Sequence, residues 1–309
     1  MMDPSALYRL ETAVDAPRPG VLLVLLGGFV DAGQVQATLG SHLLETGDPE
    51  IVASFDVDQL LDYRGRRPMM VFDTSRWTEY DDPAMLLHRL TDRDGQTYYV
   101  LTGPEPDYQW ERTVEAIREL IAMLGVSLVV TTHGIPMGVP HTRPVGMTAH
   151  ATDDALIGEA RSPFGRVQVP ASIGALLELR LGEAGQDALG FAVHVPHYLA
   201  TAEWAEGALA ALNAITDATG LNLPNDELVE RARVNQQAIA AEVANSDEAR
   251  QVITALEQQY DAFVEGQERP SLLATETSQI PSADELGAEF EDFLRSVSDD
   301  EDDPQGPTA

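Results

Sequence analysis

A Gly-Gly turn follows the first strongly apolar stretch of the chain. Residues 21–26 are six apolar residues in a row, which is typical of a strand buried on both faces. Gly27 and Gly28 follow, and Asp31 stands where the cap of the next helix is expected. Free backbone N–H groups at such a turn can bind an anion. The alternative is a turn kept for close packing, because Asp31 would repel a phosphate and the pattern Gly-x-Gly-x-x-Gly is absent.

A second candidate group follows the next uninterrupted apolar stretch, residues 126–130. His133 and Gly134 come soon after it, in a segment rich in proline and glycine that extends to residue 144. A histidine at a strand end can act as a general acid or base, but no Gly-x-Ser-x-Gly motif supplies a nucleophile. Ligands of α/β sheets bind at the carboxyl ends of strands. We therefore predict one candidate ligand-binding site, made of Gly27, Gly28, Asp31, His133, Gly134 and Arg143.

The histidines could also hold a metal ion. His133, His141 and His150 lie in or near one region, and His194 and His197 end a later strand. Two imidazoles and a carboxylate can bind zinc, but the spacing of these residues matches no metal signature. Because His194 alternates with apolar neighbours, it is also consistent with a hydrogen-bonded core histidine. We predict no metal site, no cofactor and no catalytic residue.

Composition excludes several classes of function. The chain of 309 residues has a net charge of −32, which argues against nucleic acid and anionic membrane as partners. All 19 basic residues are arginine, so a P-loop lysine or a Schiff-base lysine is excluded. There is no cysteine, and therefore no disulfide or thiolate nucleophile. Neither a signal peptide nor a membrane span is recognisable, so a cytoplasmic protein is expected.

The remaining patterns indicate an α/β fold with a mixed sheet and helices on both faces. Asp92 to Gly95 separate two β-rich runs, which predicts an antiparallel hairpin. Helices are expected over residues 106–124 and 202–219, with Gly125 and Gly220 as stops, and a third over 173–181. Residues 190–195 are expected to form a strand, and residues 131–144 a structured loop.

Three regions are predicted along the chain. Residues 1–220 form the α/β core. Residues 221–269 form a helical hairpin, with Asn225 and Ser246 as caps, that is expected to cover the core or contact a second subunit. Residues 270–309 form an acidic, mostly disordered tail. Within it, residues 282–294 carry a capping box and an amphipathic pattern, so this helix is expected to dock in cis or on a partner. Its candidate partner-binding residues are Leu286, Phe290, Phe293 and Leu294.

Three stretches together carry a family resemblance: residues 27–33, residues 134–144 and residues 195–198. On their order and spacing the chain resembles the proteasome assembly chaperone 2-like family, in its actinobacterial form. The resemblance implies a three-layer α/β/α fold similar to that of purine nucleoside phosphorylases. It also implies a role in proteasome assembly, with proteasome α-subunits as partners, and self-association into a homo-oligomer such as a trimer. The family has no established catalytic residues, so it assigns none here.

Three functions remain open at this point. The first is a non-enzymatic binding and assembly protein that acts through its helical region and loop ends. The second is an enzyme of the nucleoside phosphorylase or hydrolase type, which would need several convergent arginines beside the glycine turn, where only Arg143 is an obvious candidate. The third is a protein that binds an unidentified small molecule in the same crevice.

Overall fold

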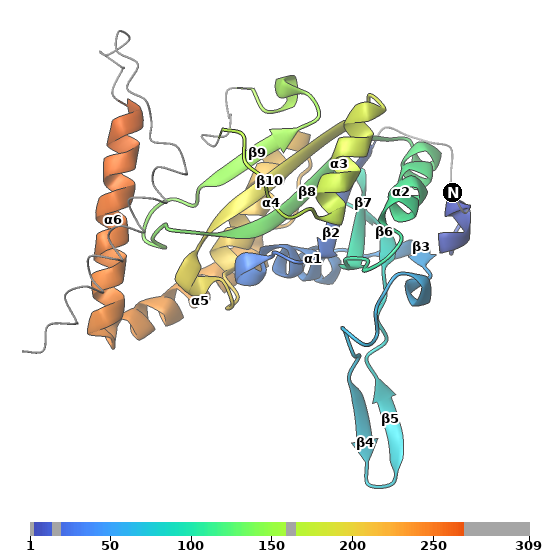
Figure 1. Ribbon diagram of the computed structural model, residues 1–309, viewed down its shortest axis with the longest axis horizontal. Helices are drawn as coiled ribbons and strands as arrows, with labels where there is room; N and C mark the ends of the chain where they lie inside the picture. Colours follow the sequence, from blue (N-terminus) through green and yellow to red (C-terminus); the bar gives the residue numbers. More distant parts are fainter. Residues whose placement is uncertain (1–2, 14–19, 159–164, 269–309) are drawn as a thin grey trace, which may run out of the picture. The chain divides into compact units, whose positions relative to one another are not determined.

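The computed structural model describes residues 3–13, 20–158 and 165–268 (Figure 1). The chain divides into two compact units, Met1–Asp261 and Ala262–Ala309. The first unit contains the described strands, and the described part of the second is the end of the last helix, α6 (Asp247–Glu268). In this described part of the chain, no helix is both long enough and apolar enough to cross a membrane.

A mixed sheet of eight strands organises the first unit, as the sequence predicts. The strand order is β1-β3-β6-β7-β2-β8-β10-β9. The four strands β7, β2, β8 and β10 are parallel, while the remaining neighbours pair antiparallel. The bounds are β1 (Tyr8–Leu10), β2 (Gly20–Gly27), β3 (Glu50–Phe55), β6 (Leu86–Thr91), β7 (Thr97–Pro104), β8 (Val126–Met137), β9 (Met147–Ala151) and β10 (Asp187–Pro196).

Helices cover both faces of this sheet and form two hydrophobic cores (Figure 1). One core contains α1 (Val35–Thr46), α4 (Ala205–Thr219) and α5 (Asp226–Ala244). The other contains α2 (Trp110–Leu124) and α3 (Ile173–Glu183). Strand β2 lies between the two cores, since Leu23 packs into the first core and Leu22 into the second. Both of its faces are buried, which explains why its apolar residues follow one another without a polar residue between them. The predicted three-layer α/β/α arrangement is therefore confirmed.

Glycines follow two helices and occupy one hairpin turn at the positions that the sequence predicts. Gly125 and Gly220 follow α2 and α4 with φ of 75° and 71°, a left-handed conformation that avoids strain only in glycine. Gly95 adopts φ 83° in the turn between β6 and β7, which pair antiparallel as expected. The described residues also form five 3₁₀ helices: η1 (Pro4–Leu7), η2 (Ala32–Gln34), η3 (Val57–Gln59), η4 (Asp154–Leu156) and η5 (His197–Leu199).

The segment after residue 130 differs from the prediction. Instead of a loop over residues 131–144, β8 continues to Met137. Its pairing with β2 ends at Thr131, but its pairing with β10 continues through Pro136, which lies opposite Val195. A proline is tolerated there because the strand has a neighbour on one side only. The loop prediction was wrong because proline and glycine indicate turns only where no long-range partner strand is available.

Of the last two helices, α5 covers the core, which is one of the two roles expected for the helical region. Helix α5 packs along α4, and its Leu228, Ala232 and Ile239 join the core of the sheet instead of pairing with α6. Asn225 precedes α5 as predicted, but its side chain makes no capping hydrogen bond. Ser246 caps α6 as predicted, since its Oγ accepts the N–H of Ala249 at 3.1 Å. Helix α5 is therefore part of the covering layer on that face.

A two-stranded hairpin lies outside the main sheet. Strands β4 (Met70–Asp73) and β5 (Arg76–Tyr80) pair antiparallel with each other alone, and Figure 1 shows them projecting from the chain between β3 and β6. Every residue of both strands is exposed. The sequence shows an apolar run here but does not predict the hairpin.

Candidate functional site

A buried carboxylate lies behind the glycine turn at the end of β2. Glu105, which directly follows β7, accepts the N–H of Phe29 at 3.2 Å and the N–H of Ile173 at 2.7 Å. Its side chain is 4% exposed. A Cβ on Gly28 would lie 2.7 Å from Glu105 Oε2, so only glycine leaves room for the carboxylate. The turn therefore packs against a side chain of the same chain.

A second carboxylate occupies the N-terminus of α1. Asp31 accepts the N–H groups of Gln36 at 2.9 Å and Ala37 at 3.1 Å, so its side chain caps α1 as predicted. The helix itself begins at Val35, three residues later than expected, with Gln34 in the N-cap position.

Asp31 also accepts the N–H of Gly134 on β8 at 3.2 Å. A Cβ on Gly134 would lie 1.9 Å from the backbone oxygen of Ala32. Asp31 thus joins two neighbouring elements at the carboxyl end of the sheet.

Four of the predicted ligand-site residues are therefore brought together: Gly27, Gly28, Asp31 and Gly134. At both helix N-termini beside them, a carboxylate of the chain takes the position that a bound anion would occupy. The sequence analysis missed Glu105, which stands between two prolines without a recognisable motif. Glu105 directly follows a strand that ends at the same edge of the sheet as β2, and this position could have identified it as a candidate site residue.

Arg143 points elsewhere. Its Nε and Nη2 donate to the two carboxylate oxygens of Asp261, each at 2.7 Å, and Nη1 lies 3.2 Å from Glu257 Oε1. Both acids belong to α6. These carboxylates raise the pKa of the Arg143 guanidinium above its ordinary value. Arg143 thus holds α6 against the loop that follows β8, and it is not directed at the glycine turn.

His133 belongs to a row of histidines on one face of three strands. It lies opposite Ala192 of β10, which lies opposite Thr148 of β9, and the alternation along these strands puts His150 and His194 on the same face. His150 Nδ1 donates to Glu178 of α3 at 2.8 Å. Burial lowers the pKa of His133, assisted by His150 and opposed by the carboxylates of Asp31 and Glu178.

The sequence spacing did not reveal this row, because strands β8, β9 and β10 meet only in the folded chain. Burial also lowers the pKa of His194, whose Nε2 lies 2.8 Å from Thr148 Oγ1. Over the described residues, no three His, Asp or Glu side chains form a group that could hold a metal ion. Within the row, His194 thus lies beside a neutral hydroxyl and His150 beside a carboxylate.

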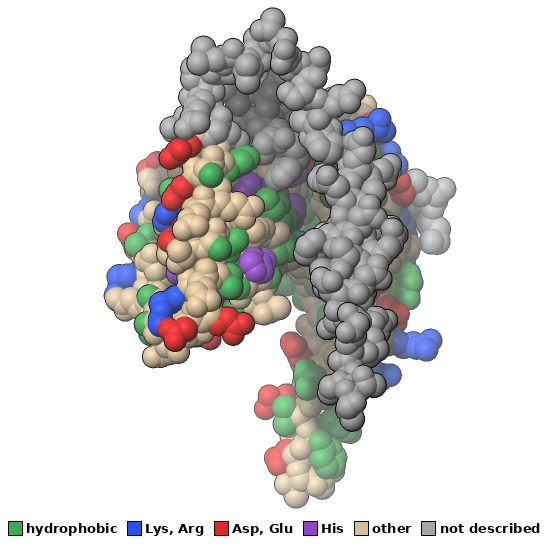
Figure 2. Space-filling model, turned by 60° about the vertical axis from the view of Figure 1, so that its left-hand side comes forward, with side chains coloured by type: hydrophobic (Ala, Val, Ile, Leu, Met, Phe, Trp, Pro, Cys, Tyr) green, Lys and Arg blue, Asp and Glu red, His purple; other side chains and the backbone are tan. Residues whose placement is uncertain are grey.

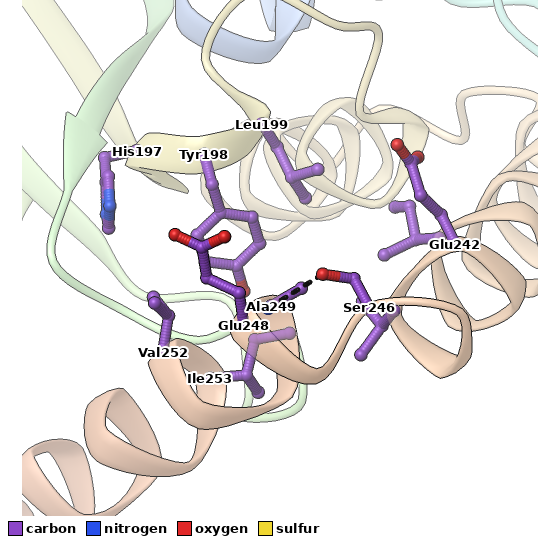
Figure 3. A pocket seen from close by; sticks show the side chains of 11 residues that line it. His197, Tyr198, Leu199, Glu242, Ser246, Glu248, Ala249, Val252 and Ile253 are labelled. Carbon is purple, nitrogen blue, oxygen red and sulfur yellow. Dashed lines mark hydrogen bonds between the residues drawn. The ribbon is translucent and has the colours of Figure 1, made fainter.

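A cavity of about 450 Å³ lies between η5 and the junction of α5 and α6 (Figure 3). Figure 3 shows His197, Tyr198 and Leu199 on one side and the first turns of α6 on the other. The Tyr198 hydroxyl accepts the backbone N–H of His141 at 2.8 Å, and it lies 2.8 Å from His141 Nδ1. Burial lowers the pKa of His141 and raises that of Tyr198, which keeps both groups neutral. These bonds fix the Tyr198 ring in the cavity wall.

The β4–β5 hairpin presents large apolar side chains to solvent. Phe72 is 56% exposed and Trp77 is 63% exposed, and their rings meet edge to face at 5.0 Å. Met69, Met70, Val71 and Tyr80 are exposed beside them. The lower part of Figure 2, where the hairpin projects, shows these hydrophobic side chains in green. The predicted partner-binding residues Leu286, Phe290, Phe293 and Leu294 lie outside the described residues.

Comparison with known proteins shows the family to which the chain belongs. The model of the PAC2 family matches residues 25–243. The chain belongs to the PAC2 family. The resemblance inferred from the sequence is thereby confirmed. A search of curated proteins found no match.

Solved structures share the fold of this PAC2 chain. The Mycobacterium tuberculosis protein of unknown function Rv2714 is 42% identical, covers 85% of this chain and 91% of its own, and has a TM-score of 0.80. A protein of unknown function from Corynebacterium glutamicum is 35% identical, covers 85% of this chain and 99% of its own, and has a TM-score of 0.79. A Mycobacterium tuberculosis proteasome-assembly chaperone homologue, Rv2125, is 23% identical over 75% of this chain and 99% of its own, with a TM-score of 0.69.

The PAC2 match helps to sort the candidate surfaces. It contains the glycine turn, the histidine row and the β4–β5 hairpin, and it ends within α5. The cavity combines residues inside the match with α6 residues beyond it. The Arg143 ion pairs likewise join a residue inside the matched region to α6.

Proposed function

We propose that this PAC2 chain is a protein-binding assembly factor that acts as a homo-oligomer, with a trimer as the expected state and proteasome α-subunits as its partner. The proposal combines membership of the PAC2 family with the surface of the β4–β5 hairpin. A solved protein of the same fold is described as a proteasome-assembly chaperone homologue. Enzymatic activity is not part of the proposal.

The exposed hairpin is the observation that carries this proposal. Large contiguous apolar patches are uncommon on monomeric proteins and are typical of protein–protein interfaces. Aromatic and methionine side chains, such as Trp77, Phe72 and Met70, are enriched in the centres of such interfaces. A second copy of the chain is a suitable partner for this hairpin, because symmetric self-association is the commonest form of assembly.

The carboxyl edge of the sheet favours this function over a nucleoside phosphorylase. An enzyme of that type needs donors that are free to bind phosphate, whereas Glu105 and Asp31 already accept the amide N–H groups there. Arg143, the candidate anion ligand, is paired with two carboxylates of α6. A phosphate approaching this edge would meet negative charge instead of free donors.

The proposed binding to proteasome α-subunits is tested by mixing the full-length chain with α-subunits from the same organism. Native mass spectrometry is expected to show a stoichiometric complex of the two proteins. A matched mixture with bovine serum albumin controls for adhesion of the exposed hairpin. If the α-subunits form no complex at micromolar concentrations, or if albumin binds equally well, the proposed partner is wrong.

A further inference from the structure

The cavity beside η5 has the composition of a ligand site. We propose that it binds a small organic cation, an ammonium group attached to an apolar body. The volume of about 450 Å³ lies within the range of about 300–1,000 Å³ that is typical of small-molecule pockets. This inference does not depend on the proposed assembly function.

The body of the ligand would contact an apolar lining. Leu199 comes from η5, Ile239 and Val243 from α5, and Val252 and Ile253 from α6. Ile239 and Ile253 are buried and give the cavity an apolar floor, while Val252 is exposed at its edge. An alkyl chain buried against this lining would be removed from water.

Two carboxylates favour a positive charge on that ligand. Glu242 near the end of α5 and Glu248 at the start of α6 line the cavity from separate helices. Both residues are exposed at the rim of the cavity. The nearest arginine in sequence, Arg250, bonds to Asp247 and to the backbone oxygen of Ala244. Both carboxylates are thus available to a cation, and they would repel an anion.

The aromatic wall completes the recognition of an ammonium group. Tyr198 lines the cavity with a ring that its hydroxyl bonds to His141 hold in place. Its face can attract a cation, which is how proteins commonly bind quaternary and alkylated ammonium groups. His197 meets the Tyr198 ring edge to face at 5.4 Å. An apolar floor, a fixed aromatic ring and two carboxylates select an organic cation over a neutral or acidic molecule.

Three probes of equal chain length test this selection. Titration calorimetry of the full-length chain at low ionic strength would compare n-octylammonium, n-octanol and octanoate. We expect n-octylammonium to bind at least tenfold more tightly than n-octanol, and octanoate to bind most weakly. Equal affinity for the ammonium and the alcohol would overturn the proposal.

Variants of the cavity lining test whether the preference for the ammonium group arises at this cavity. The double variant Glu242→Gln/Glu248→Gln is expected to lose most of the tenfold preference, while Glu227→Gln, an exposed acid on the same α5, is expected to keep it. Val252→Trp fills the cavity from its exposed edge and is expected to weaken binding of n-octylammonium at least tenfold. Unchanged binding in Val252→Trp, or an equal loss in Glu227→Gln, would show that the cation binds elsewhere on this acidic chain.

Discussion

The buried carboxylate of Glu105 accepts a hydrogen bond from the backbone N–H of Ile173, the first residue of α3, at 2.7 Å. The same carboxylate accepts the N–H of Phe29 in the turn after β2. One side chain therefore connects β7, the glycine turn and a helix at the sheet edge where α/β proteins usually bind ligands. The chain uses these donors for its own structure.

Replacing Glu105 tests this connection. Glu105→Ala leaves two backbone N–H groups without their charged acceptor, so the free energy of unfolding is expected to fall by about 2–3 kcal/mol. Urea denaturation followed by circular dichroism measures this change. Glu45→Ala, which removes an exposed carboxylate from the surface of α1, is the control. An unchanged urea midpoint in Glu105→Ala would contradict the account.

The same variant should expose an anion site. Without the carboxylate, phosphate can approach the N–H groups at the start of α3. We expect 50 mM phosphate to raise the melting temperature of Glu105→Ala more than that of the wild type at equal ionic strength. An equal response of both proteins would mean that Glu105 does not occupy an anion position.

Gly134 is expected to be intolerant of any side chain. A Cβ there would overlap the backbone oxygen of Ala32, so Gly134→Ala must displace either β8 or the start of α1. We expect a loss of about 3 kcal/mol or more in the free energy of unfolding. Gly138→Ala is the matched control, because a Cβ at that position meets no atom within 4 Å. Equal denaturation midpoints for the two variants would contradict the close approach.

Arg143 should hold the first part of α6 in place. Arg143→Ala removes the bidentate contact to Asp261 and the contact to Glu257, so amide hydrogen exchange over residues 247–261 is expected to become several-fold faster. Arg143→Lys, which keeps the charge without the fork of donors, should show an intermediate effect. High salt should accelerate exchange in the wild type and not in Arg143→Ala. Unchanged exchange in Arg143→Ala would show that α6 is positioned by other contacts.

Acidification should destabilise the fold through His88. This imidazole is buried, neither ring nitrogen has a hydrogen-bond partner among the described side chains and backbone, and burial lowers its pKa. The unfolded chain therefore binds the proton more readily than the folded chain. The free energy of unfolding is highest above about pH 6.5, the pKa of an unfolded histidine, and it falls as the pH decreases below that value. Burial acts in the same direction on His133 and His194.

Urea midpoints between pH 7.5 and pH 5.5 measure this effect. The variant His88→Leu should lose less stability over that range than the wild type, because one buried titrating group is removed. Identical pH dependence of the two proteins would show that the pKa of His88 is the same in the folded and the unfolded state, which would contradict this prediction.

The sequence predicted the fold where local patterns determine it. Residues 21–26 are apolar throughout because β2 is buried on both faces, and Gly95, Gly125 and Gly220 stand where the backbone needs positive φ. Asp31 was correctly expected to bind the first N–H groups of the next helix, although that helix begins three residues later than predicted. Such features depend on a few neighbouring residues, so spacing and residue type reveal them.

Contacts between distant residues were beyond the reach of those patterns. Pro136 suggested a loop, but β10, about sixty residues further along, pairs with β8 there. Arg143 was placed at the glycine turn, whereas its carboxylate partners lie more than a hundred residues away on α6. Glu105 gave no signal because a lone acid between prolines has no motif. The candidate site was therefore only partly predictable.

Native mass spectrometry of the full-length chain, beside the hairpin variant Phe72→Ser/Trp77→Ser, tests the proposed assembly function most directly. We expect the wild type to form a defined oligomer such as a trimer, and the variant to be monomeric with unchanged circular dichroism. The control Val229→Ser, which replaces an exposed valine on α5, should remain oligomeric. A monomeric wild type at micromolar concentration, or a hairpin variant that assembles like the wild type, would contradict the proposal that this surface mediates assembly.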